Sequence, residues 1–168
     1  MTLAWLARRD GIQRAVGVDL LPERIARARA AWPALEFQIA DGARLAFPDD
    51  SFDVVLAMTV FSSVPRETAT AILHEIGRVV RPGGGFVWYD MRRPSPRNPD
   101  VRPFSAREVQ TALPGWSIHT EHLTVAPPIA RRLGPATRRL YGILAHLPLF
   151  LTHEVGLAVR PGPFHPNA

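Results

Sequence analysis

Short apolar segments alternate with amphipathic helical patterns along this chain, and that order constrains its fold more than any other feature. The composition or alternation typical of β-strands occurs in residues 14–19, 35–40, 53–58, 86–89, 117–126 and 152–159. Apolar residues at helical spacing occur mainly in residues 22–32, 67–80 and 135–147. Strands that alternate with helices form a largely parallel sheet with helices on both faces. We therefore predict a doubly wound α/β domain.

Length and composition predict one domain. The 168 residues are enough to bury a core, and we place the domain at residues 1–160 with a flexible tail at 161–168. No stretch approaches the roughly 18 apolar residues that cross a bilayer, so we expect no membrane span and a cytoplasmic protein. The chain has no cysteine, which excludes disulfides, cysteine nucleophiles and thiolate metal sites.

The basic residues are unevenly distributed. The chain has no lysine, so all 20 basic residues are arginines, and ten of them lie in residues 91–168 against four acidic residues. A basic half can meet an acidic ligand or a nucleic acid. No zinc finger, helix-turn-helix or aromatic RNA-binding motif accompanies it, so we expect no nucleic-acid partner and interpret the charge as a solvated face.

The residues that follow the first four predicted strands form a candidate site, because ligands of open α/β sheets bind outside the carboxyl ends of the strands. They are Asp19; Asp41 and Gly42; Met58, Thr59 and Phe61; and Asp90, Arg92 and Arg93. Carboxylates beside apolar side chains suit a nucleoside, with one acid accepting from ribose hydroxyls and apolar walls against the base. Taken alone, Asp19 is equally compatible with a structural role such as a helix cap, and Asp41 beside Gly42 is more typical of a turn than of a site.

Three runs of the sequence occur in a characteristic order: VGVDLLPERI at residues 16–25, ADGARLAFPDDSFDVV at 40–55, and RVVRPGGGF at 78–86. They resemble the second strand and its helix, the adenine loop with the fourth strand, and the turn before the fifth strand of class I S-adenosylmethionine (SAM)-dependent methyltransferases of the type 11-like group. Residues 88–103 and 147–153 resemble a bacterial subgroup of the same family. The resemblance implies a Rossmann-like, mostly parallel sheet with an antiparallel last strand, and SAM as the cofactor.

The resemblance also implies roles for individual residues. Asp19 would bond the ribose hydroxyls of SAM, and Leu20 would flank the adenine. Asp41 would accept from the adenine amino group, with the Gly42 backbone nearby. The methionine end would be lined by Met58 and Thr59, with Phe61 nearer the acceptor pocket.

The family's first strand and glycine-rich loop have no counterpart here, since Met1 falls within the helix that should follow that loop. That strand lies in the family between the strands that correspond to residues 14–18 and 53–58. We therefore expect a truncated domain with its first strand missing, in which two strands lose a ladder partner and leave costly unpaired backbone groups. A late start codon, a fragment or an inactive remnant would each give such a chain.

The predicted function is methyl transfer to a small-molecule acceptor by in-line displacement, for which the protein mainly aligns the reactants. Asp90 is the candidate base for an oxygen or nitrogen acceptor, and Arg92 and Arg93 are candidates to orient an anionic acceptor. We expect no metal ion. We assign no role to His74, His119, His122 and His153.

Two other functions remain open. The first alternative to methyl transfer is an inactive methyltransferase-like remnant or an interaction module. A nicotinamide-dependent oxidoreductase also places an acid at the end of its second strand, but the loop at Asp41-Gly42 and the absence of lysine, and hence of a Tyr-x-x-x-Lys pair, disfavour it.

Overall fold

The computed structural model describes residues 3–4, 7–8, 11–94, 98, 100–125 and 151–162. Contacts divide the chain into two compact units, residues 1–47 and 48–168, and each is described by itself. The single domain predicted at residues 1–160 stays a prediction. The predicted helix at residues 135–147 and residues 163–168 of the predicted tail lie outside the described part of the chain.

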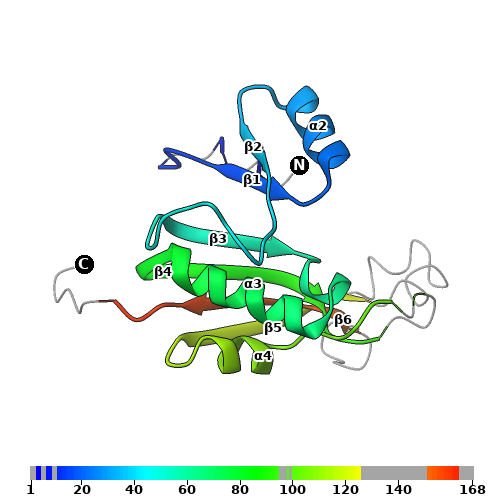
Figure 1. Cartoon of the computed structure of the whole chain (residues 1–168). Helices are drawn as coiled ribbons and strands as arrows, with labels where there is room; N and C mark the ends of the chain where they lie inside the picture. The colour runs from blue at the N-terminus through cyan, green and yellow to red at the C-terminus, as the bar shows by residue number, and fades with distance from the viewer. Residues whose placement is uncertain are drawn as a thin grey trace. The chain divides into compact units, whose positions relative to one another are not determined.

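The first unit contains a parallel two-stranded sheet and the helix that connects its strands (Figure 1). Its elements are β1 (Val16–Asp19), α2 (Pro22–Ala31) and β2 (Glu36–Ile39). Proline at the first helical position needs no partner for an N–H group, which explains why α2 begins at Pro22. Ile25 of α2 is 3% exposed and anchors the helix. These elements confirm the strand, helix and strand predicted for this region.

The second unit contains a four-stranded mixed sheet. Its strands are β3 (Phe52–Met58), β4 (Val80–Met91), β5 (Ser117–Val125) and β6 (Leu151–Val159). The spatial order is β3-β4-β6-β5; β3 and β4 are parallel, whereas β6 runs antiparallel to both of its neighbours. The α/β class and the antiparallel last strand are confirmed. The sheet is mixed because β6, the last strand, runs against both β4 and β5, which is the antiparallel last strand that the sequence predicted.

Helices α3 (Arg66–Val79) and α4 (Ala106–Ala112) lie over one face of this sheet (Figure 1). A short 3₁₀ helix, η1 (Phe61–Ser63), precedes α3. A capping box begins α4, with the N–H of Ser105 donating to the Glu108 carboxylate at 3.2 Å. The core between helices and sheet is built from Ile72, Leu73, Ile76, Val79, Phe86, Trp88, Phe104 and Val109. Within the described residues, no helix combines the length and apolarity that crossing a membrane requires.

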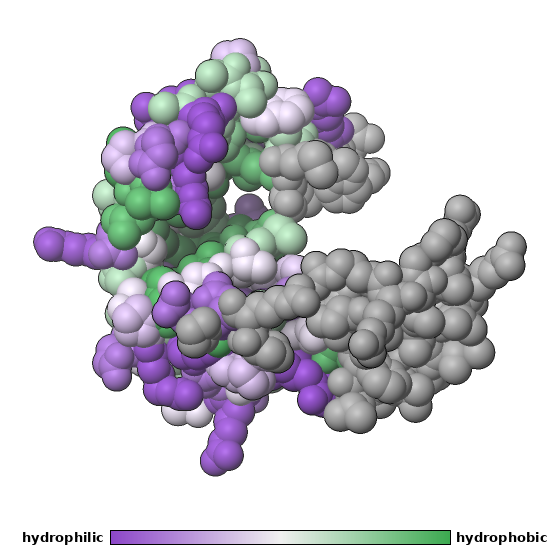
Figure 2. Space-filling view, turned by 90° about the vertical axis from the view of Figure 1, so that its right-hand side faces the viewer, coloured by the Kyte–Doolittle hydropathy of each residue, from purple (hydrophilic) through white to green (hydrophobic). Residues whose placement is uncertain are grey.

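The other face of the sheet carries exposed apolar side chains, and we call it the apolar face. Its exposed members are Val54, Leu56, Met58 and Leu157. They alternate along β3 and β6 with residues that face the helices, since successive side chains of a strand point to opposite sides. Exposed hydrophobic surface is visible on the molecule in Figure 2.

The glycine-rich run of residues 81–85 belongs to β4. The sequence predicted a turn there and a strand only at residues 86–89. β4 instead begins at Val80 and includes this run, where the register of its pairing with β3 shifts. Gly83 has a φ of 78°, which glycine adopts at little cost, and its N–H donates to the carbonyl of Arg160 at 3.1 Å.

The strands β1 and β3 belong to separate sheets. In the described part of the chain, β1 pairs with β2 and β3 pairs with β4, and neither has a second hydrogen-bonded neighbour.

Candidate functional site

Two acidic residues lie at the carboxyl edge of the β1–β2 sheet, as the sequence predicts. Asp19 is the last residue of β1, and Asp41 comes two residues after the end of β2. Asp19 is in parallel register with Ile39. The N–H of Ala40 donates to the carbonyl of Asp19 at 3.1 Å, which ties the two strand ends together.

Each of these carboxylates orders the loop that follows it. Asp19 Oδ1 accepts the N–H of Leu21 at 2.9 Å, and Asp41 Oδ1 accepts the N–H of Ala43 at 2.9 Å. Such turns hold an aspartate in place through its own backbone. Asp19 Oδ2 lies 3.4 Å from Arg24, an exposed pair of small energetic value. Each acid is therefore oriented through its Oδ1 atom. The Oδ2 atom of each could accept a hydrogen bond from a ligand, which at Asp19 would replace the contact with Arg24.

Apolar groups accompany the two acids. Leu20 is 63% exposed and Ile39 is 53% exposed, so both present bare hydrocarbon at this edge. Gly42, beside Asp41, has no side chain to obstruct a ligand. Carboxylate acceptors beside exposed apolar groups match the hydroxyl, amino and ring surfaces of an adenosine.

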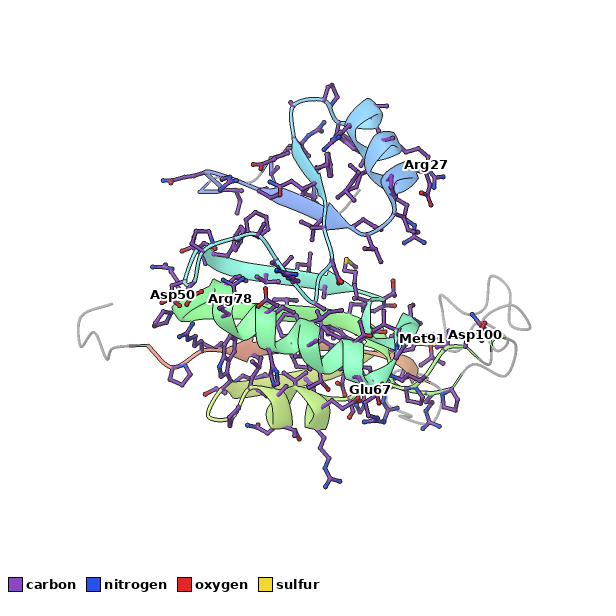
Figure 3. All side chains as sticks on the ribbon, viewed as in Figure 1. Arg27, Asp50, Glu67, Arg78, Met91 and Asp100 are labelled. Carbon is purple, nitrogen blue, oxygen red and sulfur yellow. The ribbon has the colours of Figure 1, made fainter. Side chains whose placement is uncertain are left out.

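The end of β3 holds a residue in a strained conformation. Thr59 has a φ of 53°, which is a genuine outlier for a β-branched residue. Its N–H donates to the carbonyl of Tyr89 at 2.7 Å, and its hydroxyl donates to the carbonyl of Met58 at 2.8 Å. Strain that is held by several hydrogen bonds occurs preferentially at functional sites. Met58 and Thr59 thus lie together at the carboxyl edge of β3 and β4, the end of the sheet marked by Met91 and opposite to Asp50 and Arg78 (Figure 3).

Asp90 is a buried anchor for the turn that follows β3. Its side chain lies in the core, 1% exposed. One carboxylate oxygen accepts the N–H of Phe61 at 2.8 Å; the other accepts the N–H of Ser62 at 3.2 Å and that of Met91 at 2.8 Å. A carboxylate that is enclosed and satisfied by three N–H groups does not reach a proton on an acceptor. The role of Asp90 as a base stays a prediction that this geometry does not support.

Phe61 also lies in the core. Its ring is 0% exposed, stacks on Phe104 with centroids 4.3 Å apart, and meets the edge of Phe86 at 5.9 Å. A ring enclosed in this way offers no surface to an acceptor. Its predicted place near the acceptor pocket is not supported by this burial, which follows from aromatic packing that the sequence does not reveal.

Arg92 joins the end of β4 to the start of β6. Its N–H donates to the carbonyl of Thr152 at 3.0 Å, and its guanidinium donates to the carbonyl of Leu151 at 3.3 Å. Arg93, which follows it, is half-buried. The two arginines therefore lie at the carboxyl edge of β4, as predicted, and their action on an acceptor stays a prediction.

A histidine to which sequence reasoning gave no role lies at the same edge. The imidazole of His153 stacks on the phenol ring of Tyr89, with centroids 4.8 Å apart and planes inclined by 1°. Its Nδ1 lies 3.0 Å from the hydroxyl of Thr152. Burial lowers the pKa of His153, and the Asp90 carboxylate opposes that effect in part. The available signal was the direction of the last strand: because β6 runs antiparallel, its first residues lie where β4 ends.

A cavity of about 240 Å³ in the first unit lies at the amino ends of β1 and β2, away from Asp19 and Asp41. It is lined by Ala7, Ile12, Gln13, Arg14, Ala15, Ala34, Leu35 and Glu36. Among the described residues, no three His, Asp or Glu side chains gather as a metal-binding group.

Comparison with known families gives one match that spans half of the chain. Residues 1–84 match the model of a methyltransferase domain family. This region contains β1, α2, β2, β3 and α3, and with them Asp19, Asp41, Met58 and Thr59.

Curated relatives are similar over part of the chain. A probable phthiotriol/phenolphthiotriol dimycocerosates methyltransferase of Mycobacterium ulcerans is 37% identical over 91 residues, which are 53% of this chain and 34% of the relative. A fatty-acid O-methyltransferase of Mycolicibacterium smegmatis is 37% identical over 91 residues, 53% of this chain and 32% of the relative. The chain therefore spans about a third of the length of these relatives.

Solved structures share the fold over nearly the whole chain. A SAM-dependent methyltransferase from Archaeoglobus fulgidus has a TM-score of 0.70 at 13% identity, covering 94% of this chain and 80% of its own. A geranyl diphosphate C-methyltransferase from Streptomyces coelicolor has a TM-score of 0.67 at 16% identity, covering 95% and 66%. At these identities the likeness shows the fold.

Proposed function

Because this chain belongs to the family of class I SAM-dependent methyltransferase domains, we propose that it transfers a methyl group from SAM to a small-molecule acceptor. Membership in the family implies SAM as the cofactor. The observation that carries the proposal lies within the matched region: two oriented carboxylates, Asp19 and Asp41, lie at one carboxyl edge beside exposed apolar residues.

The residues of the first unit fit the adenosine part of SAM by the chemistry of their side chains. Asp19 would accept from the ribose hydroxyls, and Asp41 from the adenine amino group. Leu20 would cover the adenine ring, and burying its exposed side chain adds about 25 cal/mol for each Å² of apolar area removed from water. Gly42 leaves room for the base.

In the second unit, the residues of the β3 edge would hold the methionine end. Met58 is 43% exposed and offers an apolar, polarisable contact. Thr59 is fixed by hydrogen bonds on both sides and presents backbone in a conformation that few residues adopt. When bound, SAM supplies an electrophilic methyl group on a sulfonium. The protein aligns the acceptor with it and excludes water, and such positioning is worth roughly 7–11 kcal/mol.

The printed names of the relatives support an acceptor that is a small molecule or a lipid. They include a fatty-acid O-methyltransferase and a 2-methyl-6-phytyl-1,4-hydroquinone methyltransferase. The apolar face, which reaches the carboxyl edge at Met58, is compatible with an acceptor that carries hydrocarbon.

Calorimetric titration of this chain with S-adenosylhomocysteine tests the proposal. We expect binding, and we expect Asp19→Asn to weaken it by about 10- to 100-fold, because a hydrogen bond to a charged group is worth about 1.5–3 kcal/mol. Glu23→Gln, an exposed acid in the first turn of α2, is the matched control and should leave the affinity unchanged. If the unaltered chain does not bind, the proposal fails and an inactive methyltransferase-like remnant becomes the better account.

A further inference from the structure

We propose that His153 is the general base for a neutral hydroxyl acceptor, with its Nε2 aimed at the acceptor and its ring held by Tyr89 and Thr152. This inference deepens the proposed function and rests on it. It assigns a catalytic group to the second unit that Asp90, Arg92 and Arg93 do not supply.

The position of His153 follows from the register of three strands. Met58 of β3 pairs with Tyr89 of β4, so their side chains point to the same face. On the other side of β4, Met91 pairs with His153 of β6, which brings the imidazole onto that same face. His153 is thus one strand beyond Tyr89 and two beyond Met58, the residue expected at the methionine end of SAM. An acceptor placed over Tyr89 would lie between them.

The orientation of the imidazole is fixed from two directions. The coplanar stack on Tyr89, with centroids 4.8 Å apart, fixes the plane of the ring. The contact of Nδ1 with the Thr152 hydroxyl at 3.0 Å fixes its rotation. When Nδ1 carries the proton and donates to that hydroxyl, Nε2 has a free lone pair. Among the described residues, none hydrogen-bonds Nε2, and the proposal places the hydroxyl of the acceptor at this atom.

The electrostatic surroundings keep this base neutral near pH 7. Burial lowers the pKa of His153, and the nearby Asp90 carboxylate counteracts part of this effect. Among the described residues, the titratable groups on neighbouring elements include Tyr89 on β4, Arg92 and Arg93 after β4, and Glu121 and His122 on β5. A neutral imidazole is the form that accepts a proton, and a base whose pKa lies below the working pH is present in that form.

The chemical step uses His153 as a proton acceptor. The O–H bond of the acceptor breaks and its proton passes to Nε2, which becomes part of an imidazolium. The electron pair left on oxygen forms the bond to the methyl carbon, while the carbon–sulfur pair of the sulfonium stays on sulfur as a thioether. A carboxylate acceptor is already ionised and needs no base, so the role is specific to hydroxyl and phenol acceptors.

The first test follows the imidazole itself by proton–nitrogen correlation spectra of this chain, with the His153 signals assigned from His153→Gln. We expect a neutral ring near pH 7 with its proton on Nδ1, and a shift of the Nε2 signal when para-octylphenol is added. His74, exposed on α3 over the opposite face of the sheet, is the internal control and should not shift. A ring with its proton on Nε2, or an Nε2 signal that para-octylphenol leaves unchanged, overturns the proposal even if SAM binds.

The second test compares acceptors in the presence of SAM. His153→Gln should lower methyl transfer to para-octylphenol by about 10²–10⁴-fold, the usual contribution of a general base. It should leave transfer to octanoate and the affinity for S-adenosylhomocysteine unchanged, and His74→Gln should change neither transfer. Equal loss for both acceptors would show a structural role and overturn the inference. Failure of the unaltered chain to bind S-adenosylhomocysteine would instead overturn the proposed function, and the spectra would still decide the state of His153.

Discussion

The carboxylate of Asp90 accepts the backbone N–H of Phe61 at 2.8 Å, across 29 positions of sequence and entirely within the core. This bond ties the end of β4 to the turn after β3. It fixes the backbone that leaves Thr59, and so it holds the shape of the edge at which we place the methionine end of SAM.

Asp90→Asn should destabilise the second unit. The amide nitrogen cannot accept an N–H, so at least one buried backbone donor loses its partner, at a cost of about 1–3 kcal/mol in the free energy of unfolding. Urea unfolding measures the loss. Asp100→Asn, an exposed acid in the following loop, is the control and should change stability by less than about 0.5 kcal/mol. Similar stabilities for the two variants would show that the Asp90 bonds contribute little.

Gly156→Ala should destabilise the sheet, because a Cβ at this position of β6 would overlap the ring of Trp88. Trp88 is fully buried and stacks on Phe86, so it cannot move aside without disturbing the core. We expect a loss of about 1–3 kcal/mol in chemical unfolding. Gly85→Ala is the matched control, since its Cβ would meet Leu157 at an ordinary 3.4 Å. Adding Trp88→Phe to Gly156→Ala should recover part of the loss; no recovery would place the strain elsewhere.

Thr59→Gly should stabilise the fold and weaken the binding of S-adenosylhomocysteine. Glycine adopts positive φ freely, so relief of the strain should offset the lost hydroxyl contact and raise the free energy of unfolding by up to about 1 kcal/mol. Affinity for S-adenosylhomocysteine, measured by calorimetry, should fall because the edge becomes less ordered. Asp50→Gly relieves the other positive φ that a non-glycine residue adopts in the described part of the chain, 56° at the far end of the sheet, and should not alter binding. Equal affinities for Thr59→Gly and the unaltered chain would argue against a role of Thr59 in the site.

The stability of the chain should decrease as the pH falls below about 6.5. The pKa of His153 in the folded protein is lower than its ordinary value of 6.5, so the unfolded chain binds more protons in this window. The stabilisation is complete above pH 6.5 and is lost as the pH falls toward the folded pKa. Urea unfolding at a series of pH values should show this slope, and His153→Gln should flatten it. An unchanged slope in that variant would assign the pH dependence to other groups.

Local sequence patterns predicted most of the secondary structure. Each described strand overlaps a predicted one, because strand and helix periods and turn residues such as Pro22 act over short distances. The position of Asp19 and Asp41 at one edge also followed from the sequence, since parallel strands share their carboxyl ends.

Properties that depend on distant residues were not predictable in this way. Phe61 follows a strand end, as many ligand-binding residues do, but Phe104 and Phe86 enclose it from other elements. Asp90 carries a carboxylate that could act as a base, but its oxygens accept hydrogen bonds from backbone N–H groups 28 and 29 positions away. His153 was overlooked because we searched only the carboxyl ends of strands for site residues. The antiparallel strand β6 begins at the same edge of the sheet, so its amino end also contributes residues there.

Successive side chains of β4 point to opposite faces of the sheet and have different roles on the two faces. Asp90 points to the helices, where it anchors a turn, while its neighbour Tyr89 points to the apolar face, where it stacks on His153. Insertion of a single residue after Val87 would exchange the two faces, exposing the anchor and burying the phenol. The second unit should therefore tolerate substitutions at the exposed positions of this strand, such as Arg81, better than any change in its length.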